Sequence, residues 1–265
     1  MPEPAFDRAP TPRLDAPRAD VLGVHVCAST FSNATTTLAN WVEAGRREYV
    51  TFTGVHGVME AQRDEALLKI HNAAGFVACD GMPLVWSCRF AGYRDAERVY
   101  GPDAMLALTE LAAAHGWRVF FYGGKEGTAE LLAAKLTERF PGLQVVGMYS
   151  PPFRDLTPDE IDAEIDMINA SGADLVWVGL STPKQERWMA ARRDALDAAL
   201  LLGVGAAFDF HAGHVRQAPA WVQRSGLEWL FRLGMEPRRL WRRYLRNNPA
   251  FVWKIARTRP TPLRP

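Results

Sequence analysis

Asp80 is the side chain in this sequence whose position best suits acid–base chemistry. It directly follows the apolar residues Phe76 to Cys79 and precedes Gly81. A short apolar run that stops at turn residues predicts a buried strand, so we expect Asp80 at the strand's carboxyl end. A carboxylate there can act as a general base. An Asp that caps the helix beginning near Met82 fits the same residues equally well.

A second stretch, Asp174 to Arg187, has the composition of a phosphate-binding turn. Residues 175–178 predict a strand buried on both faces, and residues 179–182 form the loop. Pro183 suits the first turn of the following helix, with Ser181 or Thr182 as its cap. Free amides at such a helix start attract phosphate. An ordinary strand-to-helix turn that binds nothing has the same composition.

Two further glycine turns follow apolar runs. Gly123-Gly124 follows WRVFFY and precedes a helix, which lets backbone amides approach a diphosphate, although the full GxGxxG pattern is absent. Gly205 follows the last apolar run, and Asp209 lies just beyond it. Asp209 suits a ribose or sugar hydroxyl, and a turn-stabilising role is equally compatible.

The elements that position these residues alternate between strand and helix. Expected strands cover residues 21–26, 49–53, 76–79, 117–122, 143–146, 175–178 and 198–204. Expected helices cover 32–41, one segment carrying Ala61 to Ile70, then 82–90, 102–115, 128–140, 158–170 and the stretch after Pro183. This alternation predicts an α/β fold with a doubly wound, mainly parallel, Rossmann-like sheet and sites at the strands' carboxyl ends.

Composition narrows the classes of protein. The 265 residues, 48% of them hydrophobic, suffice for one large domain with an appendage. Three cysteines without a CxxC pair indicate neither a disulfide framework nor a zinc site and fit a reducing compartment. No DxD, HExxH or His/Cys cluster predicts a metal, and no apolar run is long enough to span a membrane.

The C-terminal segment has the opposite charge from the rest. From Gly226 onward, ten basic residues stand against Glu228 and Glu236, which gives +8 and leaves −7 on the remainder of a chain whose net charge is +1. On a helix beginning at Pro237, five arginines fall within an arc of roughly 140° and the apolar residues lie opposite. This pattern fits a helix on an anionic membrane surface. A helix packed on the main domain, with a solvated basic face, is the alternative.

We therefore expect three parts: a disordered leader at 1–20, a Rossmann-like domain at 21–225 and a basic helical appendage at 226–265. The aromatic residues of the appendage share its apolar face and do not alternate with the arginines, which argues against nucleic-acid binding. The sequence leaves the oligomeric state open, including a homo-oligomer.

Six motifs, taken together, resemble the WecG/TagA/CpsF glycosyltransferases. In chain order they are CDGMPLVW (79–86), ERVYGPD (97–103), FYGG (121–124), LSTPKQERW (180–188), GVGAAFDFHAG (203–213) and APAWVQRSGLEWLFRLGMEPRRLWRR (218–243). The resemblance covers about residues 21–251. It implies an inverting, metal-independent transfer of a sugar from a UDP-sugar to a polyprenyl-diphosphate-linked saccharide, at the cytoplasmic face of the cell membrane, in surface polysaccharide synthesis.

The resemblance also assigns roles to residues. Asp80 of the DG motif is the implied base, and no cofactor beyond the UDP-sugar is implied. The implied substrate-binding residues are Thr51, Gly81, Arg98, Gly101, Gly123, Gly124, Pro183, Gln185, Glu186, Gly205, Asp209, Arg216, Arg238 and Arg239.

This sequence departs from the family at one position. Family members often have Thr-x-Asn after the second strand, whereas Thr51-Phe52-Thr53 ends in Thr, which bears on sugar preference. Two other classes of function stay open. A nucleotide-sugar epimerase or dehydrogenase requires a fuller glycine fingerprint, and a non-catalytic membrane scaffold requires only the basic appendage.

Overall fold

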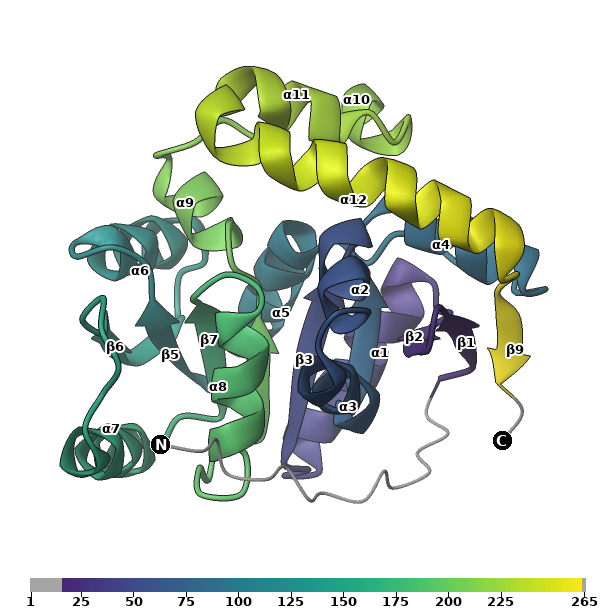
Figure 1. The fold of residues 1–265 in the computed structure, drawn as a ribbon. Helices are drawn as coiled ribbons and strands as arrows, with labels where there is room; N and C mark the ends of the chain where they lie inside the picture. Colours follow the sequence, from purple (N-terminus) through teal and green to yellow (C-terminus); the bar gives the residue numbers. More distant parts are fainter. Residues whose placement is uncertain (1–15, 264–265) are drawn as a thin grey trace. The chain divides into compact units, whose positions relative to one another are not determined.

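A computed structural model describes residues 16–263 (Figure 1). Their contacts divide the chain into two compact units. The first unit holds Ser32–Thr51 and Gly101–Val215, and the second holds residues 16–31, Phe52–Tyr100 and residues 216–263. Both units are therefore built from stretches that lie far apart in the sequence.

The first unit is an alternating α/β structure. Its strands are β3 (Glu48–Thr53, which crosses into the second unit after Thr51), β5 (Arg118–Gly123), β6 (Gln144–Tyr149), β7 (Leu175–Gly179) and β8 (Leu200–Gly203). Its helices are α1 (Phe31–Glu43), α5 (Gly101–His115), α6 (Thr128–Arg139), α7 (Pro158–Ser171), α8 (Lys184–Arg192) and α9 (Ala207–Ala212). The strands pair in parallel in the order β6-β5-β7-β8-β3.

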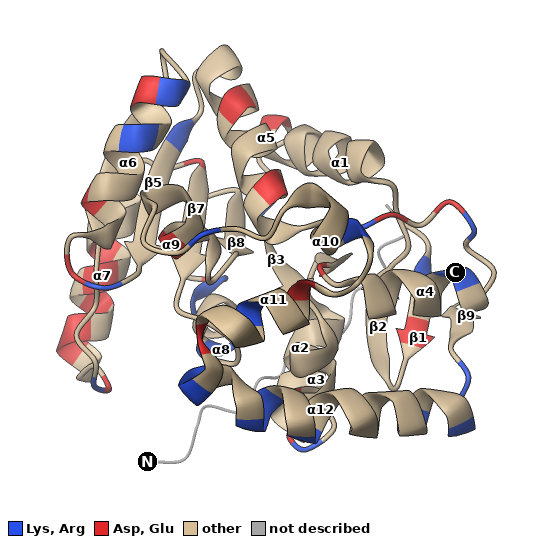
Figure 2. Ribbon diagram, turned by 90° about the horizontal axis from the view of Figure 1, so that it is seen from above, with Lys and Arg blue, Asp and Glu red and all other residues tan. Residues whose placement is uncertain are grey.

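Helices cover both faces of these strands. In Figures 1 and 2, α8 lies on one face, and α1 and α5 lie on the other. The apolar runs of β5, β7 and β8 are buried, as a central parallel strand requires. Because every crossover runs through a helix, all five strands end at the same edge, where the Gly123, Gly179 and Gly203 turns begin.

The second unit combines strands and helices from both ends of the described chain. Its strands are β1 (Arg18–Val21), β2 (Val24–Cys27), β4 (Phe76–Cys79) and β9 (Thr261–Leu263), in the order β4-β2-β1-β9. Its helices are α2 (Val55–Ala61), α3 (Glu65–Ala73), α4 (Met82–Phe90), α10 (Ala220–Arg224), α11 (Glu228–Met235) and α12 (Pro237–Arg257). β2 pairs with β4 in parallel, and β1 pairs antiparallel with β2 and β9.

The full strand order is β6-β5-β7-β8-β3-β4-β2-β1-β9. The predicted fold class, a doubly wound, mainly parallel Rossmann-like sheet, is confirmed. No helix among residues 16–263 has the length and apolar character needed to cross a bilayer.

Several predicted boundaries are wrong in the second unit. Residues 21–26 form a hairpin in place of one strand, because Leu22 and Gly23 take positive φ and reverse the chain. Residues 18–20, expected in a disordered leader, belong to β1, whereas residues 1–15 of that leader lie outside the described part. The segment carrying Ala61 to Ile70 is two helices, because the Asp64 side chain caps α3 by accepting the Leu67 N–H at 3.0 Å.

The C-terminal segment also differs from expectation. The helix expected to begin at Pro237 is α12, which runs through Pro249 as one helix of 21 residues. Beyond it, β9 pairs with β1. α11 and β9 were not predicted at all.

Candidate active site

Asp80 lies directly after β4, half-buried, with its backbone held on both sides. Its N–H donates to the Thr53 carbonyl at 3.0 Å, and its own carbonyl accepts from Arg98 Nε at 2.5 Å. The N-cap of α4 is Gly81, and no side-chain hydrogen bond caps that helix. Asp80 therefore directly precedes the N-cap residue of α4, at the end of β4.

Arg98 joins Asp80 to the C-terminal segment. Its Nη2 donates to Glu228 Oε2 at 2.5 Å, its guanidinium stacks 3.7 Å from the centroid of the Tyr100 ring, and Tyr100 Oη donates to Glu228 Oε1 at 2.8 Å. The Arg98 and Glu228 side chains are only 15% and 12% exposed. Glu228, on α11, thus fixes the guanidinium that holds Asp80.

Two pKa shifts follow from this arrangement. Burial raises the pKa of Tyr100, and the nearby charges of Glu228 and Asp80 raise it further. Burial by itself lowers the pKa of Arg98, but the charges of Asp80 and Glu228 more than offset burial and raise it overall. Tyr100 therefore acts as a neutral donor, and Arg98 stays cationic beside Asp80.

His71 packs against Thr53, the last residue of β3. Its Nδ1 is 3.4 Å from Thr53 Oγ1, and its side chain is fully buried. Burial lowers the pKa of His71 to about 4, so the imidazole is neutral at physiological pH. Thr53, which stands where the family often has Asn, is thus packed against a buried neutral ring.

In the first unit, the glycine turn after β5 has no room for side chains. Gly123 has φ +111°, and a Cβ there would lie 2.8 Å from the Gly179 carbonyl carbon. Gly124 has φ +80°, and its N–H donates to the Gly179 carbonyl at 3.0 Å. The ends of β5 and β7 therefore meet backbone to backbone, which predicts a surface that a diphosphate can approach closely.

The loop after β7 holds a buried amide and a buried acid. Gln185, 3% exposed, donates from Nε2 to the Gly203 carbonyl at 2.8 Å and to Glu186 Oε1 at 3.2 Å. Thr182 Oγ1 also donates to Glu186 Oε1, at 2.8 Å. These bonds fix the amide, and Gln185 Oε1 has no hydrogen-bond partner among the described residues. That oxygen is buried, and a Cβ on Gly205 would lie 3.2 Å from it, so a side chain at position 205 would crowd it.

The predicted cap of α8 is wrong in detail. Pro183 occupies the N-cap position, after a cis Thr182–Pro183 peptide bond, and no side chain caps the helix. Thr182 bonds to Glu186 instead. Burial raises the pKa of Glu186 above its ordinary 4.5, with the bonds from Thr182 and Gln185 opposing the shift.

The other predicted site residues differ in burial and in the element that carries them. Thr51 is fully buried in β3 opposite Gly203, Gly101 is the buried first residue of α5, and Asp209 is half-buried in the first turn of α9. In the second unit, Arg216, Arg238 and Arg239 are exposed, and Arg239 pairs with Glu236 at 2.5 Å. The structure thus groups Asp80, Gly81 and Arg98 in one unit, and Pro183, Gln185, Glu186 and Gly205 in the other.

Sequence reasoning missed Glu228 and Tyr100. Tyr100 stands in the quoted ERVYGPD motif and Glu228 in the last motif. The available signal was charge, since Glu228 is one of only two acids among ten basic residues after Gly226. An acid retained in a basic segment indicates a specific partner. Within residues 16–263, no three His, Cys, Asp or Glu side chains are grouped so that they could hold a metal ion.

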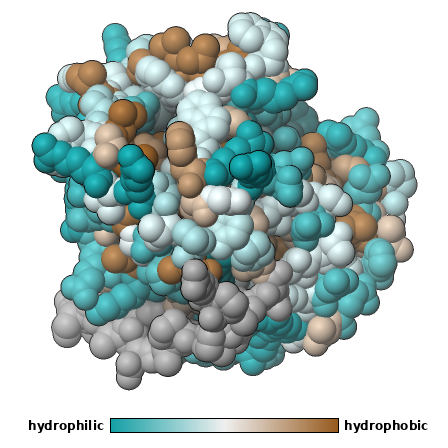
Figure 3. Space-filling model, turned by 90° about the vertical axis from the view of Figure 1, so that its right-hand side faces the viewer, coloured by the Kyte–Doolittle hydropathy of each residue, from teal (hydrophilic) through white to brown (hydrophobic). Residues whose placement is uncertain are grey.

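The face of α12 that packs on the second unit differs from the one expected. Leu240, Asn247 and Phe251 are buried, with Asn247 bonded to His56 and Arg63, whereas Trp241, Leu245 and Val252 are exposed. Blue segments in Figure 2 mark the basic residues at the start and end of the helix. Figure 3 shows one face of the molecule, on which hydrophobic residues are exposed among hydrophilic ones. The helix is therefore packed on one side and carries both apolar and cationic residues on the other.

One of the solved structures to which this chain is similar is titled "Structure of a FpvC mutant from pseudomonas aeruginosa". The match has 15% identity and a TM-score of 0.25, and it covers 70% of this chain and 56% of that one, a likeness too slight to support an argument. The comparison with family models is more informative, because residues 19–265 match the model described as "Glycosyl transferase WecG/TagA/CpsF family". Nearly the whole chain is matched, and it thus belongs to the WecG/TagA/CpsF family of glycosyl transferases, as its six motifs predicted.

Proposed function

We propose that this protein is an inverting, metal-independent glycosyltransferase that moves a sugar from a UDP-sugar to a polyprenyl-diphosphate-linked saccharide in surface polysaccharide synthesis. Asp80 carries the proposal: the residue is half-buried at a strand end, its backbone is held by Thr53 and Arg98, and the N-cap position of α4 belongs to Gly81. Family membership supports glycosyl transfer as the reaction.

In the proposed reaction, the Asp80 carboxylate removes the proton from the acceptor hydroxyl. The hydroxyl oxygen forms a bond to the anomeric carbon from the face opposite UDP. The bond between that carbon and the diphosphate oxygen breaks, and UDP leaves with the electron pair. A single base suffices, and attack from the opposite face inverts the anomeric configuration.

The departing diphosphate requires positive charge or fixed dipoles. We assign this role to the helix N-termini after Gly124 and Pro183, which begin α6 and α8, with Arg238 and Arg239 as candidate cations. Gln185 Oε1, a fixed acceptor without a hydrogen-bond partner among the described residues, is assigned to an N–H or O–H group of the donor. No cofactor is required beyond the UDP-sugar.

We further propose that α12 holds the protein on the inner face of the cell membrane. Its exposed Val252 and Trp253, which lie toward the end of the helix, would enter the interface while the arginines face anionic lipid headgroups, at about 1 kcal/mol for each basic residue. Replacing Arg238, Arg242 and Arg246 together with Gln should weaken binding to phosphatidylglycerol vesicles in a salt-dependent manner. Undiminished binding would exclude α12 as the contact. A truncation is unsuitable, because β9 beyond α12 pairs with β1.

The decisive assay measures UDP release from a panel of UDP-sugars, with and without a polyprenyl-diphosphate saccharide. We expect release that requires the acceptor, persists in EDTA and is lost in Asp80→Asn. Loss of activity in EDTA would contradict metal independence. Conversion of the nucleotide sugar without an acceptor would favour an epimerase or dehydrogenase, and inactivity with every donor would favour a non-catalytic scaffold.

A further inference from the structure

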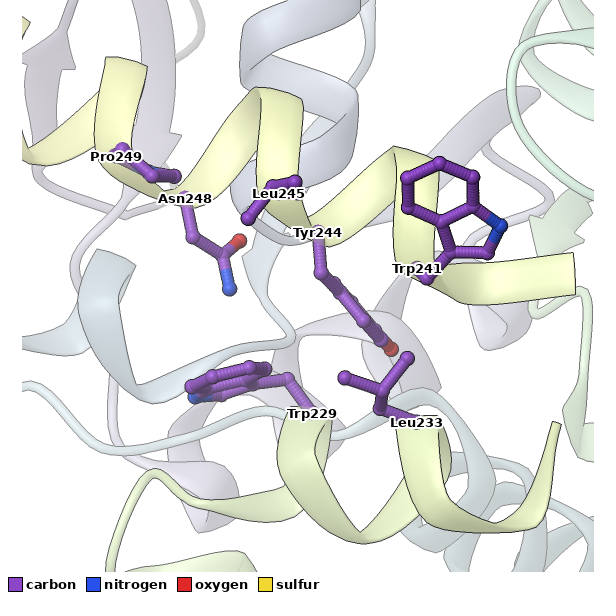
Figure 4. Close-up of a pocket in the computed structure, with 7 residues that line it drawn as sticks. All are labelled: Trp229, Leu233, Trp241, Tyr244, Leu245, Asn248 and Pro249. Carbon is purple, nitrogen blue, oxygen red and sulfur yellow. The ribbon is translucent and has the colours of Figure 1, made fainter. Parts of the chain in front are cut away.

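A groove of ≈ 330 Å³ lies between α11 and α12 in the second unit (Figure 4). α11 contributes Trp229 and Leu233. α12 contributes Trp241, Tyr244, Leu245, Asn248 and Pro249. Tyr244 and Asn248 point from α12 toward α11, and the rings of Trp229 and Tyr244 meet edge to face with centroids 5.7 Å apart. The volume of the groove is within the range of small-molecule pockets.

The lining of this groove is apolar and partly exposed. Leu245 is 69% exposed, Trp241 47% and Trp229 37%. Large apolar side chains gathered around one depression usually mark a binding site, because leaving them in water forfeits favourable burial. Asn248 is the sole amide among the lining side chains, so the groove favours a hydrocarbon over a polar ligand.

Cationic side chains flank the groove on the same helix. The Arg242 guanidinium lies over the Trp241 ring, 5.2 Å from its centroid. Arg246 follows Leu245 in the sequence, and both Arg242 and Arg246 are exposed. A hydrocarbon slot with guanidinium groups beside it is complementary to an amphiphile whose apolar chain ends in phosphate groups.

The helix that lines the groove is also connected to Asp80. Trp229 lines the groove, and Glu228, the preceding residue, bonds to Arg98, which in turn bonds to the Asp80 carbonyl. An amphiphile seated between α11 and α12 therefore contacts a helix that holds the proposed base in place. This connection favours a substrate over a structural lipid.

We propose that the groove between α11 and α12 binds the isoprenoid chain of the acceptor, next to its diphosphate. This inference rests on the proposed function and names how the acceptor is recognised. Aromatic rings facing across the slot suit the flat, branched units of an isoprenoid chain. The flanking arginines then lie beside the diphosphate that joins the chain to the saccharide.

Farnesyl diphosphate is a soluble probe for this site, and the chain offers a matched pair of variants. Leu245 lines the groove, whereas Val252, equally exposed at 67%, lies outside it on the same helix. We expect Leu245→Ser to raise the Kd for farnesyl diphosphate about tenfold, because it removes one buried side-chain contact. Val252→Ser should change the Kd less than twofold, and neither should alter the Kd for inorganic diphosphate. Tryptophan fluorescence reports binding through Trp229 and Trp241.

Several outcomes would overturn this assignment. Farnesyl diphosphate that binds no more tightly than inorganic diphosphate would show that the groove takes no chain. Equal losses in both variants, together with weaker binding to phosphatidylglycerol vesicles, would assign the residues to membrane insertion. A shift from dimer to monomer in Leu245→Ser, with an unchanged Kd, would make the groove a contact between copies of the chain.

Turnover separates this inference from the proposed function. With one saccharide diphosphate carried on a farnesyl or a hexyl chain, Leu245→Ser should raise KM for the farnesyl acceptor and leave kcat and the hexyl acceptor unchanged. If the variant transfers sugar to both acceptors with an unchanged KM, the groove does not bind the chain, and the proposed transferase activity is unaffected. If Leu245→Ser weakens binding of the chain but no acceptor receives a sugar, the proposed transferase activity is wrong, and the assignment of the groove still holds.

Discussion

The two units place different chemistry at the ends of their strands. In the first unit, the Gln185 amide and the Glu186 carboxyl are buried, and burial raises the pKa of Glu186. In the second unit, Asp80 is partly exposed, beside the Arg98 cation and the Glu228 carboxylate. The first unit thus places a buried amide, fixed by hydrogen bonds, at its strand ends, whereas the second places charged groups that are less buried.

This difference separates binding from catalysis within one fold. A buried amide held by the Gly203 carbonyl and Glu186 offers one oriented acceptor and does not move protons at neutral pH. A carboxylate near a cation, and open to solvent, can take a proton from a substrate. We therefore expect changes at Asp80 and the residues that hold it to act on turnover, and changes at Gln185 to act on donor affinity.

The largest effect should come from Asp80→Asn. This change keeps the shape of the side chain but removes the base, so turnover should fall by about 10² or more. UDP binding, measured by calorimetry, and the melting temperature should stay nearly unchanged. A near-normal rate would remove Asp80 from the role of base and erase the contrast between the units.

Lowering the pH should destabilise the folded protein, because the buried His71 binds a proton less readily than it does in the unfolded chain. Its pKa is lowered from 6.5 to about 4 in the folded state, so the unfolded chain binds the proton more readily. The stability that His71 contributes is present above pH 6.5 and is lost as the pH falls toward 4, by about 3 kcal/mol in total. Unfolding free energies of the wild type and His71→Gln over this pH range should diverge, and parallel curves would contradict the assignment.

The Glu228 carboxylate should stabilise the second unit more than a surface acid does. Glu228→Gln leaves the Arg98 charge without its partner in a mostly buried place, and we expect a loss of about 2 kcal/mol in unfolding free energy, together with reduced kcat. Glu236→Gln is the matched control. It breaks an ion pair of the same 2.5 Å length between more exposed side chains, and it should cost below about 1 kcal/mol. Equal losses would mean that Glu228 has no special role.

The smallest effect should come from the first unit. Gln185→Met keeps most of the volume but removes the acceptor and its fixing bonds, so KM for the UDP-sugar should rise about tenfold while kcat changes less. Steady-state kinetics with varied donor measures both constants. A fall in kcat with unchanged KM would place Gln185 in the chemical step and break the division between the units.

The sequence predicted the first unit more accurately than the second. Leu175 to Val178 and Trp117 to Tyr122 are recognisable as strands because a strand buried on both faces must be apolar throughout. β9 offered no such signal, since three residues carry no periodicity, and its pairing with β1 joins the two ends of the described chain. α7 carries the buried Glu164, which accepts hydrogen bonds from Trp188 and Arg192, and nothing in the helical pattern of residues 158–170 marks this acid as buried.

The sequence by itself determined the class of fold, the strand-end position of Asp80 and the family, because apolar periodicity, turn residues and motif order are local properties of the chain. Only the tertiary structure decided that Glu228 holds Arg98, that one oxygen of Gln185 has no hydrogen-bond partner among the described residues, and that Trp241 and Leu245 line a groove while Leu240 is buried. These facts depend on which distant residues meet, and burial and hydrogen bonding between distant residues leave no pattern in the chain that sets them in advance.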